Sequence, residues 1–185
     1  MNTLQVIAEL KQGNQRFLTN TRIYPNQSLE HVKYLAEHGQ TPFAVIVCCS
    51  DSRLNPMIFF DRGLGDFFIV RSAGNVLNDH SIDSIKYAVN ILSVPVVLIL
   101  GHTKCGAVTV AVENYNKSHH GCSVSQTIKR AVQQSGNQDG CAIENTIRNN
   151  TENMVNLLKQ TDFNNPVDII SGLYDIDTGQ VEFYE

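Results

Sequence analysis

Two short polar stretches, each directly after an apolar run, constrain this chain more than any other feature. Residues 49–53 (CSDSR) follow the run 43–47, and residues 102–106 (HTKCG) follow the run 96–100. The length and β-branched content of both runs are typical of strands buried on both faces of a sheet. In open α/β sheets, ligands bind beyond the carboxyl ends of such strands. We therefore expect the two stretches to meet at one edge of a sheet.

Three side chains in these stretches are suited to zinc. Cys49, His102 and Cys105 supply two thiolates and an imidazole, and they leave a fourth position for water or a carboxylate. His102 and Cys105 are three residues apart, so one turn can present both to a single ion. Cys48 adjoins Cys49 on an extended segment and should point to the opposite face, so we expect Cys49, which opens the turn, to be the ligand. The alternative is that all of them are ordinary buried or loop residues.

Asp51 and Arg53 alternate with Cys49 along the first stretch, so in an extended turn the three side chains can face one side. If Asp51 pairs with Arg53, the fourth metal position is open to water, whose pKa zinc can lower to about 7. If Asp51 instead ligates the ion, the site is closed. The plainer interpretation is a turn-stabilising aspartate with a surface ion pair.

The composition indicates a globular protein and excludes several function classes. Hydrophobic residues make up 42% of the 185 residues, and the net charge is −4, without the clustered cations that nucleic acid binding requires. No cationic leader and no run of about 18 apolar residues is present, so we expect a cytoplasmic protein without a membrane partner. The five cysteines are an odd number, which favours reduced thiols.

Helical and strand-like patterns alternate along the chain, which predicts the α/β class with a central, mainly parallel β-sheet flanked by helices and a C-terminal antiparallel hairpin. We interpret the histidine pair at 119–120 as part of a solvated loop rather than a metal or proton-shuttle site. Strands are expected at the two apolar runs, at 66–71 and at 167–172, with a hairpin turn at 177–180. Helices are expected from the start to Gly13-Asn14, after Ser28, from Pro56, and near 82–92, 107–113, 123–135 and 141–160.

These residues resemble the β-class carbonic anhydrases over most of the chain. The CSDSR and HxxC pair is highly specific, and further matches include Gly13-Asn14, Arg16-Phe17, Gly65-Asp66, Ala73-Gly74-Asn75 and Tyr87-Ala88. The resemblance implies one such domain over residues 1–185, with an N-terminal helical arm over about 1–38. It implies reversible hydration of CO₂ to bicarbonate and a proton by a zinc-bound hydroxide. Zinc would be held by Cys49, His102 and Cys105, with Asp51 and Arg53 as the catalytic dyad and Asp51 a ligand only in a closed state.

The resemblance also implies a substrate pocket and an oligomer. Gln40 matches a glutamine that hydrogen-bonds the bound anion, and Phe68, Ala73 and Tyr87 match residues that line the CO₂ pocket, some of them across a dimer interface. Gly106 is assigned to the same pocket. Ordinary packing is the plainer interpretation of these positions. Family members pair through their N-terminal helices and adjoining strands, so a homodimer or a dimer of dimers is expected.

A departure from the family pattern argues against one site that the resemblance would imply, and two other functions compete with the one it implies. Some members build a non-catalytic bicarbonate site from Trp, Arg and Tyr. Arg71 and Tyr87 match it, but Ile46 replaces the Trp, which argues against that site. Two other functions stay open: a zinc enzyme of the same fold acting on carbonyl sulfide or carbon disulfide, and a catalytically silent zinc scaffold. Asp51 and Arg53 favour an enzyme, since a scaffold would not need an orienting dyad.

Overall fold

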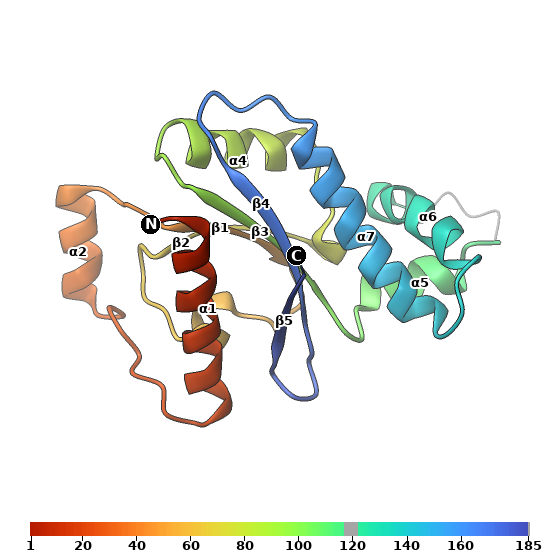
Figure 1. Cartoon of the computed structure of the whole chain (residues 1–185), viewed down its shortest axis with the longest axis horizontal. Coiled ribbons are helices and arrows are strands. Elements are labelled where there is room, and N and C mark those ends of the chain that lie inside the picture. The colour runs from red at the N-terminus through yellow and green to blue at the C-terminus, as the bar shows by residue number, and fades with distance from the viewer. Residues whose placement is uncertain (117–121, 185) are drawn as a thin grey trace.

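A five-stranded sheet forms the centre of the computed structural model, which describes residues 1–116 and 122–184 (Figure 1). The strands are β1 (Ala44–Cys49), β2 (Phe67–Ser72), β3 (Val96–His102), β4 (Asp168–Tyr174) and β5 (Val181–Tyr184). Their order is β2-β1-β3-β4-β5. The first four pair in parallel, and β5 pairs antiparallel with β4 at the edge. The predicted fold class, with its C-terminal antiparallel hairpin, is confirmed.

Most helices begin where the sequence supplies a cap. The side chains of Ser28 and Asn78 accept hydrogen bonds from first-turn N–H groups, and Asn55 caps a helix that has Pro56 at its first position. The histidine pair at 119–120 lies outside the described residues. The helices are α1 (Thr3–Leu18), α2 (Leu29–His38), α3 (Pro56–Phe59), α4 (Asp79–Asn90), α5 (Gly106–Glu113), α6 (Ser123–Ser135) and α7 (Ala142–Lys159), with a 3-10 turn η1 (Ala73–Asn75).

Helices cover both faces of the sheet, as the alternation of side chains along β4 shows. Tyr174 stacks on Phe59 of α3, with ring centroids 4.4 Å apart. Its neighbour Leu173 lines a cavity with Ile147 of α7. Because consecutive residues of a strand point to opposite faces, α3 and α7 lie on opposite sides of the sheet. Helix α1 packs beside α3, and α7 packs on β3 and β4 (Figure 1).

The prediction that the first helix ends at Gly13-Asn14 is wrong, since α1 continues to Leu18. A Cβ on Gly13 would lie 1.8 Å from the carbonyl oxygen of Phe60, so this glycine allows α1 to approach the α3 segment closely. Asn14 is buried, and its amide donates to the carbonyl oxygen of Phe59 and accepts from the N–H of Val181. Both residues therefore serve packing, not helix termination.

The two central strands are longer than the apolar runs that predicted them. Every residue of β1 and β3 is buried. Cys49 pairs with Ser72 of β2, and His102 pairs with Tyr174 of β4. Cys49 is therefore the last residue of its strand and does not open the turn, because the backbone ladder continues through it. His102 likewise ends β3.

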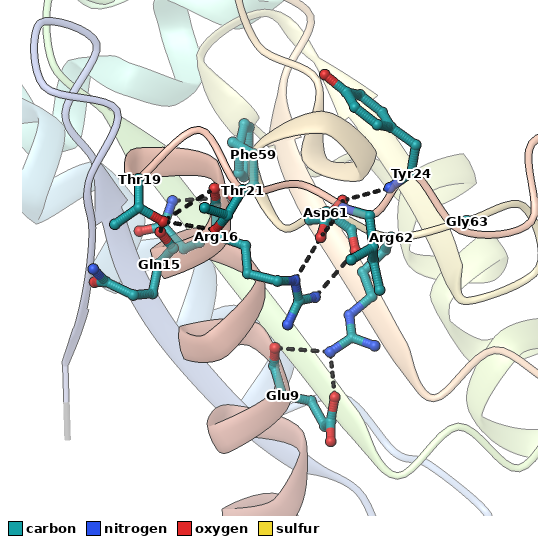
Figure 2. A network of polar contacts seen from close by, with 12 residues as sticks. Glu9, Gln15, Arg16, Thr19, Thr21, Tyr24, Phe59, Asp61, Arg62 and Gly63 are labelled. Carbon is teal, nitrogen blue, oxygen red and sulfur yellow. Dashed lines mark hydrogen bonds and ion pairs between the residues drawn. The ribbon is translucent and has the colours of Figure 1, made fainter.

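A buried carboxylate joins α1 to the body of the protein (Figure 2). Asp61 is 2% exposed and receives the guanidinium Nε of Arg16 at 2.5 Å and the backbone N–H groups of Ile23 and Tyr24 at 3.1 Å. Burial raises the pKa of Asp61, but the bonds from Arg16 and the two N–H groups outweigh it, so the pKa lies below its ordinary value. Arg62, beside it, pairs with Glu9 of α1.

Helix α2 differs from the rest, because it buries none of its own side chains. Leu29 is 69% exposed, Val32 45% and Tyr34 54%, and Ile23, which precedes the helix in the sequence, is 65% exposed. Figure 1 shows α2 standing apart from the sheet. Within the residues that the structure describes, none of the helices combines the length and apolarity that a membrane crossing requires.

Candidate metal centre

Three potential metal ligands converge at the carboxyl edge of the sheet. Cys49 ends β1, His102 ends the adjacent parallel strand β3, and Cys105 directly precedes α5. Their ligand atoms all lie within 4.8 Å of one another, and all three residues are buried. Neighbouring parallel strands bring the two ends together, and the tight turn after β3 returns Cys105 to the same point. The group can hold a metal ion.

The hydrogen bonding of His102 leaves one ring nitrogen available. Its Nδ1 lies 2.9 Å from the carbonyl oxygen of Thr103. A carbonyl can only accept, so Nδ1 carries the proton and Nε2 keeps its lone pair. Nε2 is buried and has no hydrogen-bond partner among residues 1–116 and 122–184. A buried lone pair beside two sulfur atoms, with the other ring nitrogen bonded to a carbonyl, is the arrangement of a metal-ligating histidine.

The cysteines in and beside the group differ in acidity. A hydrogen bond from the Cys105 thiol, aided by the Gly74 N–H, lowers the pKa of Cys49 to about 4 despite its burial. Donating to Cys49, together with burial, raises the pKa of Cys105. Burial raises the pKa of Cys48 to about 12. Cys49 is therefore the first thiolate to form, whereas Cys48 stays a neutral thiol in the core.

Asp51 and Arg53 form a bidentate ion pair beside the ligands. Arg53 donates through Nε to Oδ1 at 2.9 Å and through Nη2 to Oδ2 at 2.7 Å, and its backbone N–H also reaches Oδ1 at 3.0 Å. The hydrogen bonds from Arg53 hold the pKa of Asp51 well below its usual range. Asp51 is thus an oriented, ionised carboxylate, and it does not belong to the group of three ligand atoms that lie together.

Two arginines tie the ligand-bearing loops to each other. Arg53 Nη2 donates to the carbonyl oxygen of Lys104 at 3.1 Å, which joins the loop after β1 to the loop after β3. Arg71 of β2 donates to the carbonyl oxygens of Cys49 and Asp51 at 3.0 and 2.8 Å. These bonds fix the backbone on both sides of the metal-binding group.

Two of the five residues assigned to the substrate pocket lie beside this centre, and three do not. Ala73 and Gly106 are exposed neighbours of the site, next in sequence to Gly74 and to Cys105 respectively. Tyr87, 48% exposed, packs against Phe68 with ring centroids 6.3 Å apart. Ala73 and Gly106 therefore lie near the metal-binding group, whereas Tyr87 and Phe68 lie elsewhere along the sheet.

Strand geometry gives the separation. Phe68 lies four residues before Ser72, the β2 partner of Cys49, which corresponds to about 13 Å along the strand. Gln40 is exposed and precedes β1, while Cys49 ends it, and the two ends of such a strand lie about 17 Å apart. Within one chain, Gln40, Phe68 and Tyr87 are therefore at the other end of the strands from the metal-binding group.

Sequence reasoning missed the contacts behind the ligands. The N–H of Gly74 donates to Cys49 Sγ at 3.2 Å, and Asn150 of α7 donates to the carbonyl oxygen of Gly74 at 2.8 Å. In the sequence, Gly74 stands out only as part of the Ala73-Gly74-Asn75 match. Nothing in the sequence pattern singles out Asn150, because its partner lies 76 residues away and is a backbone atom.

Comparison with known proteins gives concordant results. A family model described as "Carbonic anhydrase" matches residues 44–181. Carbonic anhydrase 2 of Mycobacterium tuberculosis is 49% identical over 107 residues, which cover 58% of this chain and 51% of that protein. The chain spans about half the length of the curated relatives it matches.

Solved structures share the fold. The β-carbonic anhydrase CcaA has a TM-score of 0.74 at 21% identity, covering 98% of this chain and 87% of that one. A tetrameric β-carbonic anhydrase from Sordaria macrospora has a TM-score of 0.70 at 21% identity, covering 82% and 84% respectively. At 21% identity, the likeness to these structures shows a shared fold and nothing more.

Proposed function

This chain belongs to the β-class carbonic anhydrase family, and we propose that it catalyses the reversible hydration of CO₂ to bicarbonate and a proton. The observation that carries this proposal is the juxtaposition of the Cys49, His102 and Cys105 ligand atoms with an ionised carboxylate held by Arg53. The carbonic anhydrase names of the relatives support it. They give no support to carbonyl sulfide or carbon disulfide as substrate, or to a silent scaffold.

We propose Zn²⁺ as the ion, because two thiolates and an imidazole are the ligand types that zinc prefers, and three protein ligands leave a position for reaction. Cys49, His102 and Cys105 would hold it. When bound, zinc supplies Lewis acidity, by which water loses a proton near neutral pH. The unpartnered Nε2 of His102 and the acidic thiol of Cys49 are prepared for such an ion.

Asp51 would act directly on the attacking hydroxyl group, and Arg53 would hold Asp51 in position. Asp51, ionised and fixed on two sides by Arg53, can accept a hydrogen bond from the attacking hydroxyl group and orient its lone pair toward the carbon of CO₂. Breaking the pair would free Asp51 to take the fourth metal position, which is the closed alternative that the sequence leaves open. The described geometry corresponds to the paired state.

We propose further that the substrate pocket is assembled from two copies of the chain. Phe68 and Tyr87 form an apolar pair suited to CO₂, and Gln40 offers an amide to the anion, yet all three lie far along the strands from their own ligands. In a homodimer they would serve the partner's centre, while Ala73 and Gly106 serve their own. The exposed apolar side chains of α2 support such pairing, and the Sordaria macrospora enzyme is tetrameric.

A homodimer or a dimer of dimers follows from this arrangement. Residues 1–185 would act as one domain, because Val6 and Leu10 of α1 belong to the hydrophobic core. We propose a cytoplasmic location, because the site requires free thiols and a reducing compartment preserves them.

Stopped-flow measurement of CO₂ hydration by the zinc-loaded protein tests the proposed activity. We expect zinc-dependent hydration near neutral and alkaline pH, and a much slower reaction for Asp51→Asn. Failure of the wild type to accelerate hydration at any pH in this range would refute the proposal.

A further inference from the structure

The sulfur of Cys49 receives a hydrogen bond from a turn that lies behind the metal centre. The donor is the N–H of Gly74, 3.2 Å from Sγ, in the short η1 turn after β2. Gly74 and Asn75 both have left-handed backbone conformations, with φ of +64° and +45°. Glycine adopts this region freely but has no side chain to restrain it, so something else must hold the donor in place.

Asn150 supplies that restraint from the opposite side of the turn. It lies on α7, is 1% exposed, and donates its Nδ2 to the carbonyl oxygen of Gly74 at 2.8 Å. One helical turn further along α7, the sulfur of Met154 receives the N–H of Leu77 at 3.2 Å. Helix α7 therefore holds the segment after β2 at two points.

The packing leaves the turn little room. A Cβ on Gly74 would lie 2.9 Å from Cδ1 of Ile128 on α6. Helix α7 also lies close behind the other ligand strand, because a Cβ on Gly101, next to His102, would lie 2.5 Å from Oγ1 of Thr151. Helices α6 and α7 thus pack behind the two ligand strands. Asn150 provides a polar contact from α7 to the η1 turn beside Cys49.

The bonding of Asn150 is one-sided. Its Oδ1 is buried and accepts no hydrogen bond within the part of the chain that the structure describes. A buried asparagine with a purely structural role normally forms hydrogen bonds through both its amide nitrogen and its amide oxygen. An unpaired buried acceptor is destabilising. Here the amide keeps its donor on the Gly74 carbonyl and leaves the oxygen unpaired.

We propose that Asn150 is a positioning residue of the metal centre, which aims the Gly74 N–H at the Cys49 sulfur. This inference rests on the proposed zinc-dependent function. A hydrogen bond to a ligating thiolate fixes its orientation and reduces the charge that it donates to the metal. Asn150 would thereby tune zinc affinity and the electronic character of the sulfur without touching the ion or the substrate.

The test compares Asn150→Ala with wild type and with Asn149→Ala in the full chain. Asn149 is a matched control: it is 8% exposed on the same helix, and its amide donates to Gln138 at 3.0 Å, away from the η1 turn. Zinc affinity is measured by chelator competition. The sulfur is probed by the thiolate-to-metal charge-transfer band of the Co²⁺-substituted protein.

We expect Asn150→Ala to bind zinc about tenfold more weakly and to shift the charge-transfer band to longer wavelength, while Asn149→Ala matches wild type in both. A folded Asn150→Ala with wild-type affinity and an unshifted band overturns the inference, as does an equal change in Asn149→Ala. If Asn150→Ala does not fold, Asn150→Ser, whose hydroxyl is too short to reach the carbonyl, is judged by the same criteria. A wild type that binds no zinc would refute the proposed function itself, and this inference with it.

Discussion

The two ends of the central strands differ in how complete they are within one chain. At the carboxyl end, Cys49, His102 and Cys105 are buried, and Asp51, His102 and the backbone around them are bonded to groups of the same chain. At the amino end, the region of Gln40 and α2 is exposed, and apolar side chains on α2 lie in solvent. One chain can therefore supply all three metal ligands, whereas the proposed substrate pocket requires two chains.

The physical reason lies in the ligands themselves. Thiolates and an imidazole must be held to within a fraction of an ångström, which is best done by strand ends and short turns inside one folded unit. A pocket for CO₂ needs only an apolar wall and one or two donors, and such a wall can come from a neighbouring copy.

Replacing a ligand should abolish metal binding. For Cys49→Ser we expect the zinc content to fall from about one ion per chain to nearly none, because a hydroxyl is a much weaker zinc ligand than a thiolate. CO₂ hydration should disappear with it. Elemental analysis by mass spectrometry after dialysis against a chelator measures the content. Cys48→Ser is the matched control, since its side chain lies on the same strand outside the group, and it should retain zinc.

Removing the oriented carboxylate should slow the reaction without releasing zinc. Asp51→Asn keeps the size of the side chain but loses its charge and its bidentate pair with Arg53, so we expect hydration to fall about 10- to 100-fold. Stopped-flow rates and zinc content are measured together. Asp177→Asn, which breaks an exposed ion pair with Lys104 near the same loop, should leave both unchanged. A wild-type rate for Asp51→Asn would exclude the proposed orienting role.

Disrupting the exposed apolar face of α2 should prevent pairing of the chains but leave zinc binding intact. We expect Val32→Asp to yield monomers that keep zinc but hydrate CO₂ at least about tenfold more slowly, because the residues that position the substrate are lost. Light scattering after size exclusion gives the oligomeric state. Lys33→Asp, on the polar side of the helix, adds the same carboxylate and should stay assembled. Fully active Val32→Asp monomers would show that the pocket is complete within one chain.

Removing the buried carboxylate beneath α1 should affect stability alone. For Asp61→Asn we expect a loss of about 3 kcal/mol, the low end for a buried ion pair, because a quarter of the Arg16 side chain (25%) is exposed. The pKa of Asp61 is lower in the folded state, so its stabilisation is present above the unfolded pKa of about 3.9 and is lost as pH falls through the folded value.

Urea unfolding of both proteins between pH 7 and pH 3 measures this effect. The gap between wild type and Asp61→Asn should be constant near neutral pH and should narrow in acid. A gap that widens in acid would contradict the assigned charge state. Zinc content is expected to be equal in the two proteins.

The sequence was sufficient for the parts of the molecule that depend on local pattern. The apolar runs before Cys49 and His102 predicted the two central strands, and parallel pairing placed their ends together. The strand ends were predicted short, because the ladder continues through Cys49 of β1 and through Gly101 and His102 of β3 where a neighbouring strand is there to pair. Gly13 was misinterpreted as a helix end for a similar reason, since its role depends on the approach of Phe60.

Other features could not be predicted because they depend on distant backbone atoms. The bond of Asn150 to Gly74 and that of Arg71 to Cys49 join side chains to carbonyl groups, and a carbonyl carries no residue type to recognise. The position of Gln40 relative to Cys49 also required the strand direction. The resemblance implies a pocket shared across a dimer, and the separation along β1 indicates which residues the other copy would supply in the proposed homodimer.

One measurement tests most directly the claim that each metal centre belongs to one chain and is completed by another. Cys49→Ser and Gln40→Ala chains carrying different tags are co-expressed, and the hybrid is purified. One site of the hybrid then has an intact ligand set in the Gln40→Ala chain and an intact Gln40 in its partner. We predict a hydration rate well above that of either parent. An unimpaired Gln40→Ala parent, or a hybrid no faster than its parents, would contradict the account.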